Sequence, residues 1–205
     1  MKPTQRALLV IDVQNEYFDG KLRITHPPVT QSLPNILLAM DTANAHGMPI
    51  AVVQHSAGSG APIFADGSHG WALHADVAKR HFSHRVEKQK ASAFTGTGLA
   101  SWLQAHDVST LSIVGYMTHN CNAATIFEAS HAGFEVEFLH DAAGSLPYAN
   151  DAGTASAEEI HRVMSVVFHS NFAAVLSTQQ WLQALQSGSK PSKDNVFSSN
   201  QRALG

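Results

Sequence analysis

The chain has 205 residues, of which 44% are hydrophobic and only 14% are charged, and its formal net charge is −3. This composition excludes an extended disordered chain and a charged coiled coil, and the length favours one domain. No Lys or Arg occurs between Lys90 and Arg162, so there is no electrostatic reason for binding to nucleic acid or anionic lipid.

Short apolar runs alternate with amphipathic stretches along the chain, the pattern typical of strands that alternate with helices. Strands are predicted at residues 7–13, 49–55, 84–89, 109–117, 135–141 and 173–178. Helices are predicted at residues 32–46, 97–106, 120–131 and 156–171, and a last short helix around Trp181. Ser156 and Glu159 have the spacing of a capping box. This order predicts an α/β fold with a six-stranded, doubly wound parallel sheet between two layers of helices.

The domain is predicted to span residues 1–186, and residues 187–205 form a tail rich in Gly, Ser, Lys, Pro and Asn. Such a tail is expected to be flexible or to be ordered by a partner. The apolar run at residues 7–11 is too short for a signal peptide, and no stretch approaches the roughly 20 apolar residues of a membrane helix. Cys121 is the only cysteine, so no intrachain disulfide is possible. A cytoplasmic protein is expected.

Several common functional motifs are missing from the sequence. The 13 histidines are scattered without paired metal-ligand spacing, so no metal site is expected. The sequence has no GxGxxG after the first predicted strand, no GxSxG and no GxxxxGK[ST]. These absences disfavour a dinucleotide-binding oxidoreductase, a serine hydrolase and a P-loop NTPase.

Two polar residues stand at the ends of predicted strands, where doubly wound sheets bind their ligands. Asp12 lies in an apolar run, and it either bonds neighbouring loops or carries a proton. Cys121 opens the helix after the fourth strand, so it is either a small buried residue or a nucleophile that the helix dipole favours as thiolate. If the first and fourth strands are adjacent, the two side chains face each other and the nucleophile is favoured. Lys88 and Lys90 end the third strand, and spacing alone does not decide whether either neutralises this site.

Three segments carry a family resemblance: ALLVIDVQNEYF (residues 7–18), VEKQKASAFTGTGL (residues 86–99) and IVGYMTHNCNAAT (residues 113–125). Together with the GFEVEFLHDA continuation, the sequence resembles the isochorismatase-like cysteine hydrolase superfamily, which includes nicotinamidases, carbamoylsarcosine amidohydrolases and ureidoacrylate hydrolases. The resemblance covers most of residues 6–178. It implies a three-layer α/β/α domain that acts on a small molecule without a cofactor, as a homo-oligomer.

The resemblance also implies a catalytic triad of Asp12, Lys88 and Cys121. Lys88 is preferred to Lys90 because the family lysine lies four residues before the serine of the SAF segment, here residues 92–94. Asp12 would take the thiol proton, the Cys121 thiolate would attack a carbonyl carbon, and Lys88 would balance the charges.

The remaining site residues follow from the same resemblance. A cis peptide is expected between Tyr116 and Met117, and the backbone amides of Met117 and Cys121 would form the oxyanion hole. Substrate contacts are expected at Phe18, Trp71, Tyr116 and His119. The metal-binding nicotinamidases carry an Asp two residues before the position of His55, and this chain has none, so neither a metal nor nicotinamide is implied.

The predicted function is hydrolysis of an amide, ureido or carbamoyl C–N bond through a thioester intermediate. One alternative is ether or ester hydrolysis of the isochorismatase type with Asp12 as the acid, although the ether-cleaving members lack the cysteine. The other alternative is a binding or assembly protein on the same fold, with an inert thiol at Cys121.

Overall fold

Six parallel strands form the central sheet of the computed structural model, which describes residues 5–205. Their order in the sheet is β3-β2-β1-β4-β5-β8. The strands are β1 (Gln5–Ile11), β2 (Ile50–His55), β3 (His84–Lys88), β4 (Val108–Tyr116), β5 (Glu135–Gly144) and β8 (Ala174–Leu176). The predicted six-stranded parallel sheet is confirmed.

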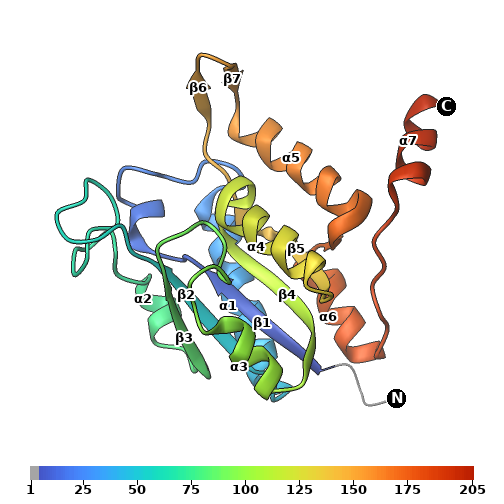
Figure 1. The fold of residues 1–205 in the computed structure, drawn as a ribbon, viewed down its shortest axis with the longest axis horizontal. Helices are drawn as coiled ribbons and strands as arrows, with labels where there is room; N and C mark the ends of the chain where they lie inside the picture. The colour runs from blue at the N-terminus through green and yellow to red at the C-terminus, as the bar shows by residue number, and fades with distance from the viewer. Residues whose placement is uncertain (1–4) are drawn as a thin grey trace.

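Helices cover both faces of the sheet, as a three-layer fold requires (Figure 1). Helices α1 (Val29–Ala45) and α6 (Thr178–Ser187) pack on one face, and α3 (Leu99–Ala105) and α4 (Ala123–His131) pack on the other. The π-helical turn η2 (Thr118–Asn122) leads into α4, and α2 (Ala75–Ala78) precedes β3. The chain continues beyond β5 through the hairpin of β6 (Tyr148–Asn150) and β7 (Gly153–Ala155), then α5 (Ala157–Val167), η3 (Phe168–Phe172) and, at the end, α7 (Val196–Leu204).

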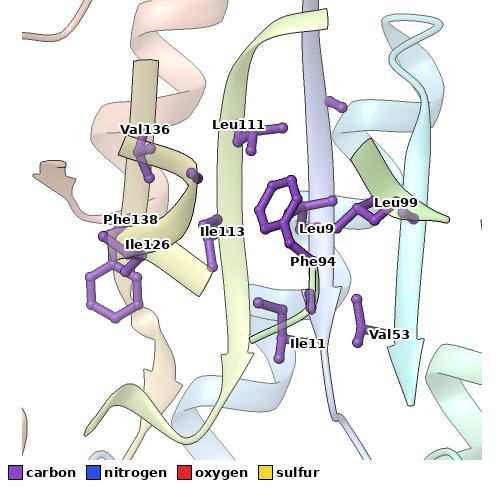
Figure 2. Packing of buried hydrophobic residues seen from close by; sticks show 14 of the residues in the cluster. Leu9, Ile11, Val53, Phe94, Leu99, Leu111, Ile113, Ile126, Val136 and Phe138 are labelled. Carbon is purple, nitrogen blue, oxygen red and sulfur yellow. The ribbon is translucent and has the colours of Figure 1, made fainter. Parts of the chain in front are cut away.

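The apolar run of β1 is explained by its position in the centre of the sheet. Leu9 and Ile11 point into the core beneath α3 and α4 (Figure 2), whereas Leu8 and Val10 point into the core beneath α1 and α6. Because both faces of a parallel sheet are covered, a central strand is apolar at every position instead of at every second one.

Some element boundaries differ from the prediction. Helix α1 begins at Val29, ahead of its predicted start at residue 32. The hairpin β6–β7 was not predicted, because strands of three residues that are mostly exposed carry no apolar alternation. The capping box at the start of α5 is confirmed, since the Glu159 amide donates to Ser156 Oγ and the Ser156 amide donates to the Glu159 carboxylate. The tail after α6 contains α7, and its ordering by a partner stays a prediction.

The winding of the chain reverses between β1 and β4. From β1 the chain adds β2 and β3 on one side, then returns to place β4 on the other side of β1. Ile11 and Gly115 are paired in this ladder, and a Cβ on Gly115 would lie 2.0 Å from the Ile11 carbonyl oxygen. Gly115 also has a φ of 107°, which favours glycine. This glycine therefore allows the ends of β1 and β4 to meet at the reversal point, where α/β sheets bind ligands.

No helix within residues 5–205 is both long enough and apolar enough to cross a membrane.

Candidate active site

Side chains from the carboxyl ends of β1, β3 and β4 converge at the reversal point. Asp12 follows β1, Lys88 is the last residue of β3, and Cys121 lies in η2 after β4. The Lys88 Nζ atom lies 2.7 Å from Asp12 Oδ2 and donates a hydrogen bond to Cys121 Sγ at 3.2 Å. The side chains of Asp12 and Lys88 are 0% exposed, and Cys121 is 5% exposed. The structure thus brings the three residues of the predicted triad into direct contact.

The geometry also distinguishes Lys88 from Lys90. The Lys88 ammonium completes its coordination with the Lys90 carbonyl oxygen at 3.1 Å and approaches His55 Nδ1 at 3.5 Å. The Lys90 side chain is exposed, and only its backbone takes part. Because β2 lies between β3 and β1, the long lysine side chain is needed to span that strand.

The backbone at Asp12 has an uncommon conformation. Its φ of 51° lies in the left-handed region, which Asp tolerates better than most residues. The Asp12 amide donates to the Val53 carbonyl oxygen, and the Asp12 carbonyl oxygen accepts from the Gln14 amide, both at 2.9 Å. The Gln14 side chain in turn bonds the amide and the carbonyl of His55. These contacts hold the carboxylate against the end of β2, and such strain is typical of functional sites.

The nucleophile turn is held by its own backbone and by one threonine. The Met117 carbonyl oxygen accepts the amides of Asn120 and Asn122, each at 3.1 Å, so the chain folds back around Cys121. Thr125 Oγ1 donates to the Cys121 carbonyl oxygen at 2.7 Å. A π-helical turn of this kind is rare and is common at functional sites.

A second contact joins the nucleophile turn to the SAF segment, because the Ala93 amide donates to Thr125 Oγ1 at 3.0 Å. The peptide bond between Tyr116 and Met117 is cis in the structure. Met117 and Cys121 both lie in the short segment that directly follows β4.

The thiol of Cys121 is predominantly protonated in this arrangement. Burial raises the pKa of Cys121, the neighbouring Asp12 carboxylate raises it further, and the Lys88 ammonium only partly opposes them. This direction is opposite to the one that a helix dipole alone favours, because burial beside a carboxylate acts against the thiolate. The pKa of Lys88 is raised, since Asp12 and Cys121 outweigh the effect of burial.

Two of the predicted substrate contacts, Phe18 and Tyr116, lie near the carboxyl ends of β1 and β4. Phe18 is half-buried, and its ring packs against His74 and Tyr116, with centroids 4.4 Å and 5.8 Å away. Tyr116 is 0% exposed, and its hydroxyl shares a hydrogen bond of 2.8 Å with Ser32 Oγ. Tyr116 is thus buried beside Phe18, and its role as a substrate contact stays a prediction.

Trp71 is half-buried at the outer strands β2 and β3. Its carbonyl oxygen accepts from Gln14 Nε2 and Gln54 Nε2, both at 2.7 Å, and its ring lies 5.6 Å from the Arg85 guanidinium. Its Nε1 is buried and has no hydrogen-bond partner among residues 5–205. The donor on this ring is consequently available to another molecule only if the surrounding loop moves.

His119 lies two residues before the nucleophile, as its place in the sequence requires. Its Nδ1 lies 3.1 Å from Ser145 Oγ, and its ring meets the edge of Tyr148 with centroids 4.9 Å apart. Its Nε2 is buried without a partner in the described part of the chain. Burial lowers the pKa of His119, so the ring is neutral near pH 7.

Aromatic residues beside the triad were missed in the sequence. Tyr17 is 2% exposed, and its ring packs on Phe64 with centroids 5.3 Å apart. Burial, and then the charges of Cys121 and Asp12, raise the pKa of Tyr17, so the phenol remains a neutral donor. Phe64 also meets the ring of His55 at 5.3 Å. Of Tyr17 and Phe64, only Tyr17 could have been found from the sequence, because it is adjacent to the predicted substrate contact Phe18.

Residues 5–205 contain no group of three or more His, Cys, Asp or Glu side chains arranged to hold a metal ion.

Comparisons with known proteins agree with this geometry. The family model of the isochorismatase domain matches residues 6–180. A crystal structure from Burkholderia xenovorans, described as a candidate isochorismatase, is 56% identical, superposes with a TM-score of 0.97, and covers 99% of this chain and 98% of its own.

Two curated relatives carry enzyme names. The streptothricin hydrolase of Streptomyces noursei is 34% identical over 67% of this chain and 49% of its own length. The ureidoacrylate amidohydrolase RutB of Acinetobacter baylyi is 25% identical over 91% of this chain and 86% of its own length.

Proposed function

Because the chain belongs to the isochorismatase family of hydrolases, we propose that it hydrolyses an amide, ureido or carbamoyl C–N bond of a small molecule through a thioester on Cys121. The observation that carries this proposal is the contact of one buried ammonium, that of Lys88, with both a carboxylate and a thiol. The name of the Acinetobacter relative, an amidohydrolase, supports C–N chemistry.

The role of Lys88 follows from charge balance. In the resting site, the Asp12 carboxylate and the Lys88 ammonium cancel, and the Cys121 thiol is neutral. When the proton moves from Cys121 Sγ to Asp12, the thiolate replaces the carboxylate as the partner of the ammonium, and the net charge of the cluster does not change. Since isolated buried charges are costly, this exchange lets a thiol with a raised pKa act as a nucleophile once a substrate is in place.

The reaction then proceeds in two halves. The Cys121 thiolate attacks the carbonyl carbon, and the amides of Met117 and Cys121 hold the oxyanion. Asp12 returns its proton to the leaving nitrogen as the C–N bond breaks, which leaves a thioester and a free amine or ammonia. Asp12 next takes a proton from water as the hydroxide attacks the thioester, the C–S bond breaks to release the acid, and the proton on Asp12 returns to Cys121 Sγ. These steps use groups of the protein, the substrate and one water molecule, and they call for no cofactor.

Substrate contacts are assigned to residues around the triad. Phe18 offers apolar surface, and the buried Tyr17 is close enough to Asp12 and Cys121 for their charges to raise its pKa. His119, with its unpartnered Nε2, adjoins the nucleophile, and Trp71 closes the side of β2 and β3. A neutral, small and partly apolar carbonyl compound fits such a set of groups.

The test is release of ammonia or amine from a panel of primary amides, ureido acids and N-carbamoyl amino acids. The wild-type protein should turn over at least one class, and Cys121→Ala and Asp12→Asn should each lose more than about 1000-fold in kcat, as removal of a nucleophile or its base does. Lys90→Met serves as the matched control and should retain activity. Equal turnover by Cys121→Ala would end the thioester mechanism and favour ether or ester hydrolysis with Asp12 as the acid. No turnover of any class by the wild type would favour a binding protein.

A further inference from the structure

Helix α5 meets the rest of the domain through a buried histidine. Only Ala157 and His161 are buried among its 11 residues, and His161 is 5% exposed. Figure 1 shows α5 beside the turn that leads into α4, and the helix contacts that turn, η2. Burial of an imidazole costs free energy unless it is hydrogen-bonded, whereas an aliphatic side chain would fill the same place without that cost. A polar partner is therefore expected where α5 meets η2.

That partner is the hydroxyl of Thr118, the first residue of η2. His161 Nδ1 lies 2.8 Å from Thr118 Oγ1, which also donates a hydrogen bond to the Gly144 carbonyl oxygen at 3.1 Å. Thr118 is 0% exposed, so both bonds are shielded from water. The hydroxyl has one proton and the carbonyl can only accept, so both bonds form together when the Nδ1–H group of His161 is the donor. The two bonds fix the start of η2 to α5 and to the end of β5.

Other side chains hold the later part of the nucleophile turn. Thr125 Oγ1 donates to the Cys121 carbonyl oxygen at 2.7 Å, and Asn122 Nδ2 donates to a carbonyl oxygen of β4 at 2.8 Å. Both of these side chains come after the nucleophile in the sequence. Thr118 precedes the nucleophile and directly follows Met117, whose amide is assigned to the oxyanion hole together with that of Cys121. The contact with α5 therefore acts at the end of the turn where Met117 lies.

The His161 ring is neutral near pH 7 and lies outside the triad. The rings of His26 and His140 flank it, with centroids 5.8 Å and 6.4 Å away. Burial first, and then the neighbouring His140 and His26, lower the pKa of His161 to about 4. Within the described part of the chain, the ring has no hydrogen bond to a triad residue. His161 therefore acts through Thr118 and not as an acid or a base.

We propose that His161 is a positioning residue that holds the nucleophile turn through Thr118, so that the amides of Met117 and Cys121 stay aimed at an oxyanion. It rests on the proposed hydrolase function, because the oxyanion forms when the Cys121 thiolate attacks a carbonyl carbon. Loss of one oxyanion donor lowers kcat about 100- to 1000-fold. Loss of the positioning bond leaves both donors present but less well aimed, so an effect of about 10- to 100-fold is expected. The oxyanion develops only in the transition state, so the loss should fall on kcat and leave KM nearly unchanged.

The first test compares His161→Phe, which keeps a ring but no donor, with His161→Asn, whose amide places a donor near the position of Nδ1. On the best substrate of the panel, His161→Phe should lower kcat about 10- to 100-fold with KM within about twofold of the wild type. His161→Asn should recover kcat to within about threefold of the wild type. His131→Phe, at an exposed histidine of α4, is the matched control and should change neither constant.

Three results of this comparison would overturn the positioning role. They are an unchanged kcat in His161→Phe, a loss that lies in KM, and a folded His161→Asn that is as slow as His161→Phe. The last result would mean that the site needs the shape of the histidine and not its hydrogen bond.

A double-mutant cycle shows whether the two side chains act through one contact. Thr118→Val removes the hydroxyl and nearly preserves the shape of the side chain, so it breaks the same contact from the other side. The double variant Thr118→Val/His161→Phe should therefore be less than about threefold slower than the slower single variant. Losses that multiply would show that the two side chains act independently, contrary to the proposal.

A further test needs no substrate of the enzyme. Acetaldehyde adds to the Cys121 thiol, and the thiohemiacetal carries an oxygen where the oxyanion would lie, whereas iodoacetamide alkylates the same thiol by displacing iodide and builds no oxyanion. With isotopically labelled acetaldehyde and NMR, the Kd of the adduct should rise at least about tenfold in His161→Phe, while the rate of alkylation should change less than about twofold.

The pair of reagents separates the two proposals. Equal weakening of both reactions in His161→Phe, or no aldehyde adduct on the wild type, would overturn the positioning role. If the split between the reagents is found but no compound of the panel is hydrolysed, the proposed C–N hydrolysis fails and the positioning role of His161 stands.

Discussion

Ionisation of the Cys121 thiol should destabilise the folded protein at alkaline pH. Burial and the Asp12 carboxylate raise its pKa above the value in the unfolded chain. A group with a raised pKa contributes stability that is fully present below the unfolded pKa and is lost as the pH rises toward the folded pKa. The loss therefore begins near the unfolded thiol pKa of about 8.5. Lys88 acts in the same direction but starts at a higher pH, near its own unfolded value of about 10.4.

The size of the effect follows from the shift. Each pH unit between the unfolded and folded pKa values costs about 1.4 kcal/mol, so at about pH 10.5 the thiol alone has cost roughly 2.7 kcal/mol. Because Cys121 is only 5% exposed, screening by solvent reduces this figure little. A thiolate in the resting site would give the opposite sign, since a lowered pKa stabilises the folded state above it.

The assay is urea unfolding followed by circular dichroism at about pH 7 and about pH 10.5, for the wild type and Cys121→Ser. The serine does not titrate in this range, whereas Lys88 and the tyrosines are present in both proteins, so the comparison isolates the change made at position 121, including its coupling to Lys88 and Tyr17. The wild type should lose about 2.7 kcal/mol more than the variant over this interval. Equal losses, or a smaller loss in the wild type, would refute the protonated thiol.

Three substitutions test other parts of the site. Lys88→Met leaves the buried Asp12 carboxylate without its partner, so it should lower the free energy of unfolding in urea by about 3–5 kcal/mol. Lys90→Met, at an exposed position, should change it by less than about 0.5 kcal/mol. Equal losses in the two variants would contradict the buried pair. Gly115→Ala should lower the free energy of unfolding by about 3 kcal/mol or more in the same assay, because Gly115 has a φ of 107° and a Cβ there would lie 2.0 Å from a backbone oxygen. Gly47→Ala should lower it by about 1 kcal/mol, because Gly47 has a φ of 63° but open space around it. Tyr17→Phe removes a hydroxyl that feels the charges of Cys121 and Asp12, so kcat/KM should fall about 2- to 10-fold while the melting temperature changes little, and an unchanged kcat/KM would remove Tyr17 from the site.

Much of the fold could be predicted because its signals are local. The apolar run of β1 indicates a strand covered on both faces, and the capping box of Ser156 and Glu159 gives the start of α5 to the residue. The hairpin β6–β7 has no such signal, since its residues are mostly exposed. Helix α7 was missed for a related reason, because its apolar residues do not pack on its own domain.

The candidate site was partly predictable for a topological reason. The carboxyl ends of parallel strands share one edge, so residues directly after β1, β3 and β4 are brought together once the strand order is known. The pKa of Cys121 was not predictable, because burial and the Asp12 charge arise only in three dimensions. The same holds for Tyr116 and Tyr17, since the direction of each ring depends on how the loops pack.

The thioester on Cys121 is tested most directly by rapid quenching of wild-type protein with the best substrate of the panel, followed by mass spectrometry of the peptide that contains Cys121. The predicted result is a mass increase equal to the acyl part of the substrate on Cys121 Sγ, absent in Cys121→Ala, which should not turn over. An acyl mass on another residue, or turnover that persists in Cys121→Ala, would contradict it.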